Sequence, residues 1–153
     1  HVDHCATPLP RDPVLAGIKH LNRLHQVLAR AEVDSRGLDE GLCAFDDGHL
    51  VCATAANLFA VVDGELRTPP VTEAGIAGVC RAALLADPRF GRDIRCTTLS
   101  REDLARASEI FLTNAVRGVR PVRRCGNREL SPGAASVAAR AAMARVGLPP
   151  MEG

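Results

Sequence analysis

The chain has 153 residues, enough to bury the core of one domain, and its 46% apolar and 24% charged residues are typical of a globular protein. A net charge of +1 provides no strong field for nucleic acid or a membrane surface, and 3% aromatic residues without Trp or Tyr argue against base stacking. No apolar run approaches the length of a membrane span, and no signal peptide is visible. We therefore expect no nucleic-acid and no membrane partner.

The cysteines give no sign of a metal site or of a disulfide framework. The six positions are 5, 43, 52, 80, 96 and 125, and no two have the spacing of metal ligands. A chain of this length does not need disulfides for stability, so we expect reduced thiols and a cytoplasmic protein. His1, Asp3, His4 and Cys5 could in principle form a terminal metal site. A frayed terminus is the better interpretation, and we predict no metal.

Residues 1–13 contain three prolines and little periodicity, which is the composition of a linker. We interpret them as the remnant of an interdomain linker, and residues 14–148 as one domain. A domain that begins with a linker suggests that other residues precede it in the native polypeptide.

Lys19 is the only lysine, since the other 18 basic side chains are arginines. Residues 14–31 have a helical pattern with Leu21, Leu24 and Leu28 on one face, and Lys19 is expected near the start of that helix. A desolvated lysine can attack a carbonyl, as in a covalent aldehyde cofactor, whereas arginine cannot. On its uniqueness alone, a solvated lysine at a helix start is the simpler interpretation.

Strand and turn signals follow the helical segment. Residues 41–45 and 49–52 flank the turn sequence Asp-Asp-Gly at 46–48, and residues 57–62 and 65–68 flank Asp63 and Gly64. These patterns predict two antiparallel hairpins, and Pro69 and Pro70 end the second one.

Residues 75–81 (Gly-Ile-Ala-Gly-Val-Cys-Arg) open a helix that is expected to run to about Asp87. Glycines before a helix let the backbone approach a ligand, and the free N–H groups of the first turn then suit a phosphate. The Gly-x-x-Gly pattern alone is more simply a loop-to-helix junction.

The last third of the chain reads as strands followed by a helix. Strands are expected at 94–98 and 109–113, with a capping box from Ser100 to Asp103 between them. Residues 114–119 form a turn, a last hairpin joins 119–125 to 128–130, and an alanine-rich helix spans 134–146.

Four motifs together resemble the larger domain of the class IV, fold-type IV pyridoxal-phosphate enzymes. They are the segments 19–24, 56–59, 75–81 and 111–122, which occur in the family's order between about residues 10 and 130. Residues 19–28 resemble the aminodeoxychorismate lyase branch more than the branched-chain or D-amino-acid aminotransferases. The resemblance implies an α+β fold of the D-amino-acid aminotransferase type, in which a mixed or antiparallel sheet has flanking helices.

The resemblance also implies roles for individual residues. Lys19 is the expected catalytic residue, which would hold pyridoxal 5'-phosphate as an aldimine and then move a proton. The backbone amides of Val79 and Cys80 would bind the phosphate, with Asn114 and Ala115 completing that side. Arg23 and Asn57 would support the cofactor and the lysine segment, and a homodimer is expected.

Two departures from the family pattern stand out. Cys52 occupies the position of a family glutamate that faces the pyridine nitrogen, and a thiol is a poor substitute for a carboxylate. The chemistry could tolerate this, the site could have decayed, or Asp46 or Asp47 could reach in from the turn. The family's smaller N-terminal domain has no counterpart before residue 10.

The expected function is that of aminodeoxychorismate lyase, which converts 4-amino-4-deoxychorismate to p-aminobenzoate and pyruvate in folate biosynthesis. A branched-chain or D-amino-acid aminotransferase of the same family is the alternative. A non-catalytic domain that only assembles with a partner is the third possibility, and Cys52 favours it.

Overall fold

The computed structural model describes residues 1–91 and 94–147, so the expected domain end at 148 lies outside the described residues. The first of its two five-stranded sheets has the order β10-β9-β1-β2-β3. Its strands are β1 (Val2–His4), β2 (Glu40–Ala44), β3 (Leu50–Ala53), β9 (Arg124–Cys125) and β10 (Arg128–Glu129). β1 is parallel to β2 and β9, whereas β2 and β3 form the antiparallel hairpin predicted around residues 46–48.

The second sheet has the order β6-β5-β4-β7-β8. Its strands are β4 (Asn57–Val62), β5 (Glu65–Thr68), β6 (Ile94–Cys96), β7 (Glu109–Asn114) and β8 (Gly118–Pro121). The hairpin of β4 and β5 is confirmed, and β5 and β6 are the one parallel pair described in this sheet. The predicted last hairpin is wrong in part, because residues 118–121 pair with β7 instead, and only the short β9 and β10 pair with each other.

Alternation along β4 and β7 builds the core on both faces of the second sheet. Leu58 and Leu112 point toward the first sheet and join one apolar cluster with its side chains, while Phe59 and Phe111 point to the opposite face. The two phenylalanines are cross-strand partners, and their rings stack with centroids 4.9 Å apart. Burial of each aromatic side chain contributes about 1.5–3 kcal/mol to folding.

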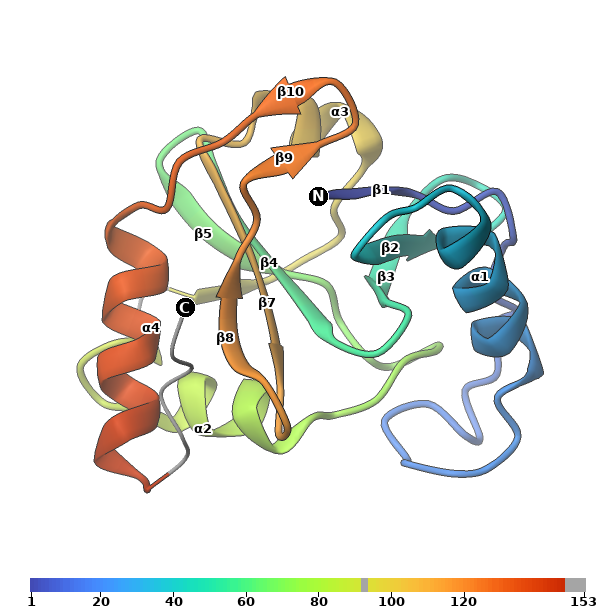
Figure 1. Cartoon of the computed structure of the whole chain (residues 1–153). Coiled ribbons are helices and arrows are strands. Elements are labelled where there is room, and N and C mark those ends of the chain that lie inside the picture. The colour runs from blue at the N-terminus through green and yellow to red at the C-terminus, as the bar shows by residue number, and fades with distance from the viewer. Residues whose placement is uncertain (92–93, 148–153) are drawn as a thin grey trace.

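Helices cover the outer faces of both sheets (Figure 1). They are α1 (Leu24–Ser35), α2 (Val79–Ala86) and α4 (Ala134–Arg145), whereas α3 (Arg101–Arg106) packs its Leu104 into the cluster between the two sheets. α2 and α4 lie over the second sheet, and α1 lies over β2 and β3 of the first (Figure 1). Within the described parts of the chain, no helix has the length and apolarity that a membrane span requires.

Two helices have specific N-terminal caps. The predicted capping box is confirmed at α3, where the Asp103 backbone N–H donates to Ser100 Oγ and the Ser100 N–H donates to the Asp103 carboxylate. The hydrogen bond from the Ser100 backbone N–H lowers the pKa of the Asp103 carboxyl group. α4 is capped from the sheet instead, because the buried carboxylate of Glu109 accepts the N–H groups of Ala135 and Ser136.

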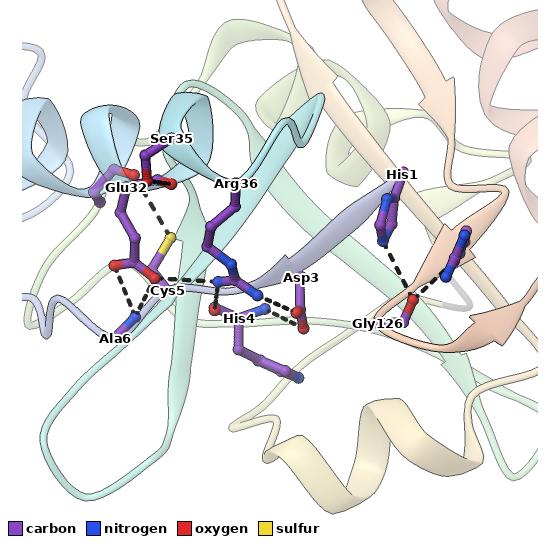
Figure 2. Close-up of polar contacts among 11 residues, drawn as sticks. His1, Asp3, His4, Cys5, Ala6, Glu32, Ser35, Arg36 and Gly126 are labelled. Atoms are coloured by element: carbon purple, nitrogen blue, oxygen red, sulfur yellow. Dashed lines mark hydrogen bonds and ion pairs between the residues drawn. The ribbon is translucent and has the colours of Figure 1, made fainter.

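The interpretation of residues 1–13 as a poorly packed linker is wrong. Their first residues form β1, and Val2, Cys5 and Leu9 are buried. Figure 2 shows how α1 holds this segment: Glu32 accepts the Ala6 N–H at 2.8 Å, and Arg36 donates to the His4 carbonyl at 2.8 Å. Residues 2–4 are therefore an integral strand of the first sheet, and Cys5 and Leu9 after them pack into its core.

The helix expected at 14–31 is also displaced. α1 begins at Leu24, so Lys19 lies in the loop before it, and the predicted apolar face of Leu21, Leu24 and Leu28 is exposed. The buried face consists of Ala29 and Val33, which are small enough for the helix to lie close to β2 and β3.

Candidate cofactor site

One edge of the second sheet brings the predicted site residues together. β4 begins at Asn57, its antiparallel neighbour β7 ends at Asn114, and β8 begins at Gly118. Because neighbouring antiparallel strands start and end at the same edge, these polar residues lie next to one another. β5 also ends at this edge and leads into the loop that precedes α2.

The Lys19 loop is attached to the turn before α2 by backbone hydrogen bonds. Gly17 forms an isolated parallel bridge with Ile76: its N–H donates to the Gly75 carbonyl at 3.1 Å, and its carbonyl accepts the Ala77 N–H at 3.0 Å. Lys19 follows two residues later, and its side chain is exposed. The structure therefore places Lys19 beside the glycine turn, although the two segments are far apart in the sequence.

Asn57 holds the same turn from the sheet side. Its Nδ2 donates to the Ile76 carbonyl at 2.8 Å, and the side chain is buried. Gly78 leaves room for this contact, because a Cβ at position 78 would overlap Asn57 Oδ1. The turn is thus fixed on both sides, by Gly17 and by Asn57.

The N-terminus of α2 is open to a ligand. Gly75 has a φ of +86°, which lets the chain turn, and no side chain caps the helix at Gly78. Val79 and Cys80 are the first two helical residues, so their N–H groups have no intrahelical acceptor. Burial raises the pKa of the Cys80 thiol, so this residue contributes a neutral side chain and a backbone donor.

Asn114 shapes the loop on the other side of the sheet edge. Its Nδ2 donates to the Ala55 carbonyl at 3.0 Å, and its Oδ1 accepts the N–H groups of Val116 and Arg117. The side chain of Asn114 is therefore occupied by its own loop and by the segment before β4, and Ala115 is exposed directly after it. Any hydrogen bond from Ala115 to a ligand has to come from its backbone, because its side chain is apolar.

Cys52 lies in the apolar cluster beneath α1, with 4% of its surface exposed. It is the cross-strand partner of Cys43, and Cys5 belongs to the same cluster. The neighbouring Cys5 and Cys52 thiols and burial raise the pKa of Cys43. The suggestion that Asp46 or Asp47 reaches into the site is wrong, because both carboxylates form surface ion pairs with Arg11.

A small open pocket of about 110 Å³ lies beside the Lys19 loop. Its wall includes Asp12, His20, Arg23 and Gly75 but none of Lys19, Asn57, Val79, Cys80 or Asn114. The pocket therefore adjoins the turn at Gly75 without including these predicted site residues, and Arg23 lies in its wall.

Two polar residues at the sheet edge were not predicted from the sequence as part of the site. Arg81 is buried and donates to the Pro69 carbonyl at 3.0 Å, which ties α2 to the start of the loop before it. Thr113 is 1% exposed, and its hydroxyl has no hydrogen-bond partner. Both lie in family motifs, Arg81 in 75–81 and Thr113 in 111–122, but the sequence alone assigned neither of them a role.

Comparison with known proteins places the chain in a family. Residues 2–125 match the amino-transferase class IV family, and the chain belongs to it. Aminodeoxychorismate lyase from Vibrio harveyi is 37% identical over 119 residues, which cover 77% of this chain and 44% of that protein. A putative branched-chain-amino-acid aminotransferase from Methanocaldococcus jannaschii is 33% identical over 115 residues, covering 74% of this chain and 40% of the relative.

Solved structures agree with this fold. 4-Amino-4-deoxychorismate lyase from Pseudomonas aeruginosa superposes with a TM-score of 0.86 at 37% identity, over 94% of this chain and 54% of that chain. A branched-chain aminotransferase from Thermoproteus uzoniensis has a TM-score of 0.87 at 21% identity, over 97% of this chain and 51% of that chain, and shows the fold alone. The chain thus has the fold-type IV architecture and spans about half the length of these relatives.

The contact between Asn57 and Gly78 can be tested by a double-mutant cycle. Gly78→Ala is expected to lower the free energy of unfolding by about 1–3 kcal/mol, because the added Cβ displaces Asn57 from Ile76. In an Asn57→Ala background the same substitution is expected to lower the free energy of unfolding clearly less, because the side chain that clashes with the added Cβ is gone. Urea unfolding of the four proteins measures this, and equal costs in both backgrounds would show that the two residues do not meet.

Proposed function

We propose that this chain is the cofactor-binding part of an aminodeoxychorismate lyase, which converts 4-amino-4-deoxychorismate to p-aminobenzoate and pyruvate. The observation that carries the proposal is the backbone bridge from Gly17 to Ile76, which sets the only lysine beside an uncapped helix N-terminus. Two relatives at 37% identity are lyases of this name, which supports the lyase over other activities of the family.

The residues at the sheet edge fit pyridoxal 5'-phosphate. The uncapped first turn of α2 supplies the N–H groups of Val79 and Cys80 for the phosphate, and Gly78 leaves room for Asn57 to hold the turn that precedes them. Lys19 is exposed two residues beyond the bridge, so its amine can reach the aldehyde, and no other lysine competes for it. Asn114 and Ala115 would border the phosphate from the loop after β7.

Bound pyridoxal phosphate supplies an electron sink for the substrate carbon that bears the amino group. The Lys19 amine, once released from the cofactor, would accept the ring proton of the substrate. Asn57 would keep the turn, and with it the phosphate donors, in place. We place the reaction in the cytoplasm, where the six free cysteines remain reduced.

Cys52 stands where the family pattern has a carboxylate. A buried thiol next to Cys43 cannot replace a carboxylate as partner of the pyridine nitrogen, so a weaker electron sink is expected. An aminotransferase is the second candidate, because relatives with that activity reach 33–34% identity. A non-catalytic domain is the third candidate, and Cys52 is the observation that favours it.

The borohydride reaction tests whether Lys19 carries the cofactor. Reduction after addition of pyridoxal phosphate is expected to add the cofactor's mass to the peptide that contains Lys19, and Lys19→Ala is expected to lose the label. Peptide mass spectrometry identifies the labelled residue. A label found only on the N-terminal amine would exclude Lys19 as the attachment site.

A pyruvate assay separates the candidate functions. For this assay the chain is joined to the part of the Pseudomonas lyase that lies outside the matched region. Half of a cleft cannot orient the substrate, and proximity and orientation lower the activation barrier by up to ~7–11 kcal/mol. The lyase proposal predicts pyruvate and p-aminobenzoate from 4-amino-4-deoxychorismate without a keto acid. Turnover only with a keto-acid acceptor would indicate an aminotransferase, and no turnover despite cofactor binding would indicate a non-catalytic domain.

We further propose that the chain forms a homodimer through an apolar surface around the Lys19 loop. Among the described residues, six of the ten exposed large apolar side chains lie between positions 14 and 28, and solvent exposure of so many is unfavourable. We call them the 14–28 surface: Val14, Ile18, Leu21, Leu24, Val27 and Leu28. Burying this surface in a dimer would also fix the loop that carries Lys19.

Sedimentation velocity tests the dimer. The wild-type chain is expected to sediment as a dimer, and Leu24→Gln with Leu28→Gln is expected to shift it to the monomer. Val137→Gln is the matched control, because Val137 is equally exposed but lies on α4. A wild-type chain that stays monomeric at high concentration would contradict the proposal.

A further inference from the structure

Thr113 has a polar atom that the fold itself does not satisfy. The residue is 1% exposed on β7, a strand paired on both sides, and its Oγ1 has neither a donor nor an acceptor within reach in the described structure. A buried hydroxyl without a partner lowers the stability of the fold, because it has lost its hydrogen bonds to water. By contrast, the buried hydroxyl of Thr68 in the same sheet donates to the Leu58 carbonyl at 2.8 Å.

The direction in which Thr113 points follows from the register of β7. Leu112 faces the first sheet and Phe111 faces α2 and α4, so Thr113 points to the side of α2. Its cross-strand partner on β4 is Asn57, whose side chain contacts Ile76 and Gly78 at the start of α2. Side chains of such partners lie about 4.5–5.5 Å apart at Cβ, so the hydroxyl lies beside the first turn of α2.

Two kinds of hydrogen-bond donor without an acceptor therefore lie at the start of α2. They are the N–H groups of its first turn and the hydroxyl of Thr113. An anion with several oxygen atoms satisfies both, since a hydroxyl can donate to one oxygen while the backbone amides donate to others. We propose that Thr113 is an anion-binding residue of this chain, which donates its hydroxyl to a phosphate group held at the N-terminus of α2.

This inference deepens the proposed function, and it rests on that function where the phosphate belongs to the cofactor. It also gives a reason for the missing hydrogen bond: the hydroxyl costs stability in the free protein and is satisfied when the phosphate binds. Removal of the hydroxyl is therefore expected to have opposite effects on folding and on phosphate binding, a combination that a purely structural role does not produce.

The test compares wild type with Thr113→Val, which has nearly the same shape without the hydroxyl, and with Thr113→Ser, which restores it. Thr113→Val is expected to melt at or above the wild-type temperature without ligand and to bind pyridoxal phosphate about tenfold or more weakly. Its affinity for pyridoxal, which has no phosphate, is expected to change less than about twofold. Thr113→Ser is expected to bind pyridoxal phosphate nearly as well as wild type. Thr68→Val is the matched control, because it loses a satisfied hydroxyl and is expected to lower the melting temperature without selecting between the two ligands.

Equal weakening of both ligands, or unchanged affinity for pyridoxal phosphate, would overturn the role of Thr113. If wild type binds no pyridoxal phosphate, the proposed function fails, and inorganic phosphate then decides about Thr113 alone. Amide resonances of Val79 and Cys80 that move with phosphate in wild type, and move much less in Thr113→Val, would support the anion site. No response of these amides in wild type would overturn it.

Discussion

The candidate site depends on a short backbone pairing between two loops. Gly17 exchanges hydrogen bonds with Gly75 and Ala77, and this pairing brings the lysine loop to the turn that opens α2. Backbone groups make these bonds, and the positive φ angles of Gly17 and Gly75 are ones that glycine adopts readily. Without the pairing, Lys19 would lie in a loop of undefined direction before α1, and no chemistry could be assigned to it.

The second sheet gives this pairing a fixed base. Asn57 starts β4 and reaches the Ile76 carbonyl, and its neighbour β7 presents Thr113 and Asn114 at the same edge. Arg81 attaches α2 to Pro69 at the end of β5. Three segments that are distant in sequence are thus held around one helix N-terminus, while the stacked Phe59 and Phe111 anchor the strands that carry them.

Much of the fold could be predicted from local signals. The two hairpins have turn residues at the right spacing, and the capping box at Ser100 and Asp103 requires only four residues of sequence. Strand β1 could not be found in this way, because its three residues pair with distant positions, 40–42 and 125, and only Val2 is buried. The start of α1 was misplaced because the leucines follow a helical period but face outward, while Ala29 and Val33 make the actual contact with the sheet.

The sequence suggests a set of candidate site residues but not their arrangement. Family motifs suggest Lys19, Asn57, Val79 and Asn114, and these stay predictions, whereas the pairing of Gly17 with Ile76 and the isolated hydroxyl of Thr113 depend on the folded chain. Cys52 shows the opposite case, since its position in the motif suggested a place at the cofactor, and the structure packs it with Cys43 beneath α1. Position in a motif therefore predicts where the backbone runs better than it predicts what the side chain does.

Amide hydrogen exchange at Gly17 and Ala77 tests the central claim most directly, because these two N–H groups make the pairing. If the lysine loop is docked on the turn, both amides are expected to be protected and to open together with similar free energies. Neighbouring loop amides without an acceptor, such as that of Lys19, are expected to exchange much faster. Unprotected Gly17 and Ala77 amides in a chain whose β4 amides remain protected would contradict the account, because the lysine loop would then be detached from the site.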